Sequence, residues 1–163
     1  METITTYDFK TKAQEAFKHS KDHYLDDLNA MSQEALTTSP GGCARTPADF
    51  TYEIIVINKR IAKRLKGEDP GPFKFEGWMK APEELNDKDA LIKEFTATCE
   101  DIESALSAVP GDEMLRTIQL PKDTTNPYDL VRFTAYHMGY HDAQLNYIQA
   151  LADDGEMHWK FDD

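Results

Sequence analysis

The stretch FTAYHMGYHDAQL, residues 133–145, decides the fold and carries two histidines four residues apart. Residues at this spacing lie on the same face of an α-helix, one turn apart. The face itself is apolar, because the two histidines share it with Leu130, Thr134, Leu145 and Ile148, of which three are aliphatic. The pattern predicts a helix over about 127–152 whose two imidazoles point into a core.

Two buried imidazoles need polar partners. A divalent metal ion would satisfy both rings, because neutral imidazole is a common ligand of such ions. The alternative is a pair of core histidines whose ring nitrogens bond to hydroxyl groups or to the backbone. Pairs at this spacing are common by chance, so the apolar face is what favours the metal. We therefore predict that His137 and His141 bind a metal ion.

Three further amphipathic helices are predicted from apolar residues at helical spacing, over about 5–31, 47–66 and 87–109. The helix at 47–66 has a clear start, since Thr46 can cap it and Pro47 suits its first position. Four such helices joined by long connecting loops form a bundle. We predict an all-α four-helix bundle, with residues 1–163 as a single domain.

Glu53 is the unusual residue of the helix at 47–66. It lies at the edge of the apolar face and has no basic residue four positions away. One interpretation is that its carboxylate reaches solvent, because glutamate is seldom buried unpaired. The other is that it is the third ligand of the ion held by His137 and His141. Two imidazoles and one carboxylate are typical of catalytic ions that keep positions open for water.

Other candidate features receive structural interpretations. His19 and His23 share the four-residue spacing, but His19 falls among charged residues, so no functional metal is predicted there. Cys99 is expected to be a small core residue. The connection 67–86 contains Phe73, Phe75 and Trp78, which we expect to pack over one end of the bundle, and Trp159 is expected to pack back onto the body.

Composition excludes several classes of protein. At 163 residues and 40% hydrophobic content the chain is not disordered. A net charge of −12 repels phosphate backbones, so nucleic-acid binding is not expected. No apolar run is long enough to span a bilayer and no secretory signal is visible. We therefore expect a cytoplasmic protein that does not bind membranes.

The chain resembles the DinB-like (YfiT-like) superfamily of metal-dependent four-helix-bundle enzymes. The resemblance covers nearly the whole length and rests on His137-x-x-x-His141 followed by Asp-Ala-Gln-Leu, and on the Thr46-Pro47 helix start. In that family a histidine seven residues after the cap is the third ligand, whereas this chain has Glu53. The resemblance implies a His/His/Glu site with one extra negative charge, or a Glu53 that only accepts a hydrogen bond from an imidazole.

What the resemblance implies about function is a small-molecule enzyme. Three ligands with open positions suit a hydrolase, and relatives that use low-molecular-weight thiols suggest a thiol transferase with a thiol cosubstrate. Zinc or nickel is expected first, then iron or manganese. Tyr136, Tyr140 and Asp142 are candidate acids or bases, and Asp142 is expected to be solvated or to support a ligand. Family members are often homodimers, and the alternative is a non-catalytic, stress- or damage-associated dimeric bundle with a structural or vestigial site.

Overall fold

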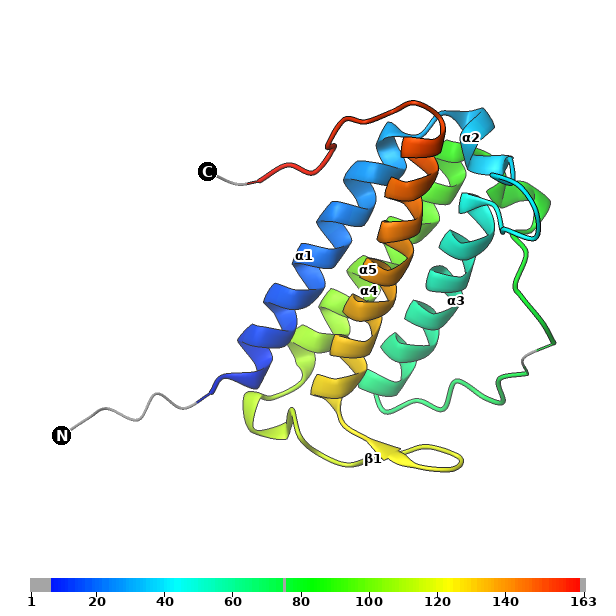
Figure 1. The fold of residues 1–163 in the computed structure, drawn as a ribbon. Helices are drawn as coiled ribbons and strands as arrows, with labels where there is room; N and C mark the ends of the chain where they lie inside the picture. The colour runs from blue at the N-terminus through cyan, green and yellow to red at the C-terminus, as the bar shows by residue number, and fades with distance from the viewer. Residues whose placement is uncertain (1–6, 75, 162–163) are drawn as a thin grey trace.

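The structure, a computed structural model, describes residues 7–74 and 76–161 and has four long helices packed as a bundle (Figure 1). The predicted fold class is confirmed. The long helices are α1 (Phe9–Ala30), α3 (Pro47–Leu65), α4 (Lys88–Ala108) and α5 (Pro127–Leu151). The short elements are α2 (Gln33–Thr37), η1 (Glu83–Leu85), η2 (Gly111–Glu113) and the antiparallel pair β1 (Ile118–Gln119) and β2 (Thr124–Thr125).

Polar caps set the starts of the long helices. Asp8, Thr46, Asp87 and Asn126 each accept a hydrogen bond from the backbone N–H three residues ahead. Each such cap contributes about 1 kcal/mol to helix stability. The predicted start of the first helix near residue 5 lies outside the described residues, and α1 begins directly after its Asp8 cap.

The helices are connected by a crossover rather than in simple up-and-down order. Lys59 pairs with Glu94 and Lys66 pairs with Asp101, so α3 and α4 run in the same direction. The connection between them therefore returns along the side of the bundle to the end where α3 began (Figure 1). The helix α5 packs against α1 on one side and against α3 on the other, and it runs antiparallel to α3.

The core is mostly apolar and contains a few buried hydrogen bonds, two of which link three of the helices. The hydroxyl of Thr134 on α5 donates to the Asn58 side-chain oxygen on α3, and the Asn58 amide donates to Cys99 Sγ on α4 at 3.7 Å. Cys99 is fully buried, as expected for a core residue, and burial raises its pKa to about 12. The largest buried side chains are Phe17, Tyr24, Leu28, Leu36, Ile54, Ile55, Leu91, Phe95, Ile102, Leu106, Met114 and Met138.

The aromatic residues of the long connection do not pack over one end of the bundle, so that expectation is wrong for the two that are described. Trp78 is 68% exposed and Phe73 is also exposed. Their rings instead face cations, since the Arg45 guanidinium lies 4.6 Å from the Trp78 ring centroid and that of Arg60 lies 5.0 Å from Phe73. Phe75 lies outside the described residues.

The segment after α5 returns to the bundle. Trp159 donates its indole N–H to Asp27 Oδ2 at 2.6 Å and stacks on His23, with ring centroids 4.4 Å apart. The expectation that Trp159 packs back onto the body is therefore confirmed. No helix in the described part of the chain has both the length and the apolar character needed to cross a membrane.

Candidate metal centre

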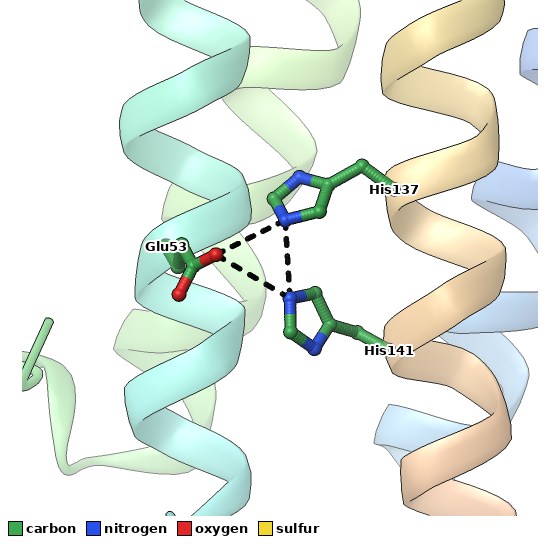
Figure 2. Close-up of side chains that lie close together, drawn as sticks. All are labelled: Glu53, His137 and His141. Atoms are coloured by element: carbon green, nitrogen blue, oxygen red, sulfur yellow. Dashed lines mark hydrogen bonds and ion pairs between the residues drawn. The ribbon is translucent and has the colours of Figure 1, made fainter. Parts of the chain in front are cut away.

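The structure brings Glu53, His137 and His141 together where α3 packs against α5. Figure 2 shows the Glu53 side chain extending from α3 towards the two imidazoles of α5. The His137 and His141 Nε2 atoms are 3.1 Å apart. Glu53 Oε1 lies 3.2 Å from His137 Nε2 and 3.7 Å from His141 Nε2. The interpretation in which Glu53 reaches bulk solvent is wrong, because its side chain is only 17% exposed.

These separations fit one divalent ion. Ligand atoms about 2.0–2.2 Å from an ion, at tetrahedral or octahedral angles, are about 3–3.5 Å from one another. The three donor atoms all lie within 4.8 Å of one another, and their separations of 3.1, 3.2 and 3.7 Å are in or close to that range. Among the described residues no other group of three histidine, cysteine or acidic side chains is close enough to hold a metal ion.

Gln144 fixes the orientation of one ring. Its side-chain oxygen lies 2.7 Å from His141 Nδ1. Because an amide oxygen only accepts, Nδ1 carries the proton and the Nε2 lone pair is left facing Glu53 and His137. The motif that predicted the helix therefore also contains the residue that sets the tautomer of its second histidine.

The His137 ring has polar neighbours at Nε2, namely Glu53 and His141. The Nδ1 atom of His137 is buried and has no hydrogen-bond partner among the described residues. When Nε2 carries a proton, it can donate to Glu53 Oε1, which is the hydrogen-bonded alternative predicted from the sequence. When the proton moves to Nδ1, the Nε2 lone pair joins the other two donors.

Burial sets the protonation states that a metal requires. It lowers the pKa of His137, and it lowers the pKa of His141 to about 4. Burial alone would raise the pKa of Glu53, but hydrogen bonding and charge from Arg45 outweigh it, so this pKa lies below its ordinary value. At neutral pH the site holds two neutral imidazoles and one carboxylate, the forms that coordinate divalent ions.

Arg45 is the residue that the sequence analysis missed. It precedes α3, eight residues before Glu53, and its guanidinium forms an ion pair with Glu53 Oε2. This contact leaves Oε1 for the imidazoles. It also balances the extra negative charge that a glutamate brings to the site. A search for helical ion pairs examines residues three or four positions apart, so it cannot find a partner that lies before the helix.

Aromatic rings pack around His141. Phe50 stacks on it at 5.1 Å with an angle of 2° between the rings, and Tyr140 contacts it edge-on at 5.0 Å. Of the three candidate acids or bases, Tyr140 is therefore beside the cluster. Tyr136 is 71% exposed and lines a different hollow with Ala16 of α1.

Asp142 faces α1 and not α3, and the expectation that it is solvated is wrong. It is buried against Asp27 of α1. Burial, together with the nearby Asp27 carboxylate, raises the pKa of Asp142 far above its ordinary value. Asp27 Oδ2 also accepts hydrogen bonds from Asn146 and Trp159. Asp142 therefore belongs to the α1–α5 contact and not to the metal centre.

The second histidine pair also has a structural role. The rings of His19 and His23 lie 4.0 Å apart, and His23 is covered by Trp159. Burial and the neighbouring His19 lower the pKa of His23. His23 thus forms part of the surface on which the C-terminal segment lies.

Comparisons with known proteins identify the fold and the family. A crystal structure of a conserved protein from Enterococcus faecalis superposes with a TM-score of 0.67, at 14% identity, covering 93% of this chain and 98% of the other. At that identity the likeness shows the fold alone. No curated protein sequence matches this chain. The family model of the DinB superfamily matches residues 12–145, which include all three residues of the cluster. The chain therefore belongs to the DinB superfamily.

Proposed function

We propose that the protein is a metal-dependent enzyme that acts on a small molecule, with a divalent ion held by Glu53, His137 and His141. One observation carries the proposal: three donor atoms in ligand-competent protonation states meet within 4.8 Å inside the bundle. A divalent ion bound there would supply Lewis acidity, lowering the pKa of a coordinated water or thiol and polarising a substrate oxygen.

The surrounding residues of this chain have separate tasks in that enzyme. Gln144 holds His141 in the tautomer that leaves Nε2 unprotonated. Arg45 keeps Glu53 ionised and turns Oε1 towards the histidines. Phe50 and Tyr140 pack against the His141 ring and exclude water from it. Tyr140 is the candidate proton donor to a leaving group, because it carries a phenol hydroxyl and its ring touches the His141 ring.

Two reaction classes suit this arrangement, hydrolysis and transfer of a low-molecular-weight thiol. Neither cysteine belongs to the cluster, and burial keeps the Cys99 thiol protonated. A sulfur nucleophile would therefore come from a cosubstrate. Membership of the DinB superfamily supports both classes, and zinc or nickel is the first choice of ion for the donor set.

Elemental analysis tests the proposal. We expect protein purified without added metal, or loaded with zinc or nickel, to hold one ion per chain. His137→Ala and His141→Ala should abolish binding with circular dichroism unchanged, whereas His19→Ala, an exposed histidine outside the cluster, should bind normally. Activity should then be assayed with ester and amide substrates and with a panel of small thiols and electrophiles. A folded wild-type chain that takes up none of these ions would contradict the proposal and favour a non-catalytic bundle.

A further inference from the structure

Beside the metal centre lies a hollow of about 670 Å³ between the loop that precedes α3 and the outward face of α5. The loop contributes Gly41 and Ala44, and α5 contributes Ala143 and Tyr147. Small-molecule sites usually have volumes of about 300–1,000 Å³. The hollow is therefore large enough for a compound of one or two rings.

The hollow and the metal centre share side chains. Phe50, Tyr140 and Gln144 all line the hollow, and each of them also contacts the His141 ring. A molecule in the hollow would thus lie one side chain away from a ligand of the proposed ion. This places the hollow where the non-reacting part of a substrate would sit.

The lining of the hollow carries almost no free charge. Arg45 is the one ionic side chain among the described residues that line it, and its charge is already paired with Glu53. Other hollows of the same molecule are lined by ionic residues, such as Glu103 and Asp69. For a chain with 30 acidic and 18 basic residues, a lining without a free charge selects neutral ligands.

The walls of the hollow are also unusually apolar for an exposed surface. Tyr140, Tyr147 and Leu151 are each more than half exposed along this face of α5. Covering such a surface releases water and is favourable in proportion to the apolar area buried. An apolar ligand would therefore gain more here than a polar one.

We propose that this hollow binds the neutral, apolar part of the substrate, such as an aromatic or aliphatic group. That the bound group belongs to a substrate rests on the proposed function, but the binding of an apolar group does not require a metal ion. A charged thiol would not be held here, so the hollow would discriminate between acceptor molecules and not between thiols.

A pair of matched fluorescent probes tests the proposal. N-phenyl-1-naphthylamine is neutral, and 1-anilinonaphthalene-8-sulfonate has the same rings with a sulfonate added. We expect the neutral probe to bind metal-free wild-type protein saturably, one per chain, and roughly tenfold more tightly than the anionic probe. Equal or tighter binding of the anionic probe would overturn the assignment of a neutral ligand.

Variants locate the binding. Ala143→Trp should fill the hollow and weaken binding of the neutral probe roughly tenfold or more, while Ala150→Trp, an exposed alanine of α5 outside the hollow, should not. Tyr147→Lys should weaken it by placing a charge on the wall of the hollow, with Tyr136→Lys, at a similarly exposed tyrosine of α5 outside the hollow, as its control. Equal effects of each variant and its control would overturn the proposal.

The outcomes separate this proposal from the proposed function. If the chain binds the probe but takes up no metal, the binding site in the hollow is supported and the metal-dependent enzyme is contradicted. If the chain takes up metal but does not bind the probe, the proposed function is supported and the binding site in the hollow is contradicted. If a second copy of the chain covers the hollow, sedimentation should show a dimer that Ala143→Trp dissociates, with probe affinity falling as protein concentration rises, and that result would overturn the proposal.

Discussion

Two clusters of mostly buried ionisable side chains lie on different faces of α5, one towards α3 and one towards α1, and the consecutive residues His141 and Asp142 belong to them. His141 faces α3 and meets Glu53, which is paired with Arg45. Asp142 faces α1 and meets Asp27. The first cluster combines a carboxylate stabilised by a cation with neutral imidazoles. The second places two like carboxyl groups close together, and burial and this proximity raise the pKa of Asp142. Burial is common to both, so it is the identity of the partner that makes one cluster suited to bind a cation and the other suited to hold two helices together.

The largest expected effect is on metal affinity, which should depend on the first cluster and not on the second. Glu53→Gln should lower zinc or nickel affinity at least about 100-fold, because it removes a charged ligand and not only a supporting contact. Asp142→Asn should leave the affinity nearly unchanged, although it alters the residue next to His141. Isothermal titration calorimetry measures both affinities. A large loss of metal affinity in Asp142→Asn would show that the two clusters act as one site.

Removing the cation of the first cluster should destabilise the metal-free protein. Arg45→Met leaves a mostly buried carboxylate unpaired, at a cost of about 1–3 kcal/mol, below the range for a fully buried pair because both side chains retain some exposure. Added zinc should restore much of the lost stability, since the bound ion replaces Arg45 as the cation that compensates the charge of Glu53. Urea unfolding with and without zinc checks this, and Arg132→Met, an exposed arginine on α5, is the control.

The pH dependence of stability should have opposite signs in the two clusters. The lowered pKa of His141 means that the unfolded chain binds a proton more readily, so this stability is present above about pH 6.5 and is lost as pH falls towards 4. The raised pKa of Asp142 means the reverse: its contribution is present below about pH 4 and is lost as pH rises through the raised value.

Asp142→Asn isolates the alkaline part of that dependence. An amide can donate to Asp27 at any pH, so the variant should be about 1–2 kcal/mol more stable than wild type at pH 8 and little different at pH 5. Metal-free protein unfolded in urea at both pH values provides the measurement. A variant that is less stable at pH 8 would show that Asp142 and Asp27 do not repel each other.

The smallest effect concerns the tail over the second cluster. Trp159→Phe keeps a ring against His23 but removes the donor to Asp27 Oδ2, which should cost about 1 kcal/mol of stability. Metal affinity should not change, because neither Trp159 nor Asp27 contacts the cluster of Glu53, His137 and His141. Thermal unfolding and calorimetry together check this, and an altered metal affinity would show coupling across α5.

Much of the first cluster could be predicted from the sequence because its signal is local. The stripe of α5 fixes where His137 and His141 point, and the Thr46 cap fixes the register that places Glu53 on the inner side of α3. Both depend on interactions within a few residues of the chain. The DinB-like fold follows from the same apolar spacing and is confirmed.

The second cluster could not be predicted, because the apolar stripe in the sequence of one helix does not show how many other helices pack against it. α5 is packed between α1 and α3, so its buried arc is wider than the stripe that marks it. Asp142 lies in the part of that arc covered by α1. Arg45 was missed for a related reason, since it reaches Glu53 from a loop whose path depends on tertiary packing.

The crossover that brings α3 and α5 together also decides when the site can exist. Glu53 and His137 are 84 residues apart in the chain, and the last helix supplies both imidazoles. During synthesis, a ribosome-bound chain that ends before residue 141 has the carboxylate but not both rings, so tight metal capture should begin only once α5 has emerged and docked. Bound metal would then serve as a marker of a fully synthesised and correctly assembled molecule.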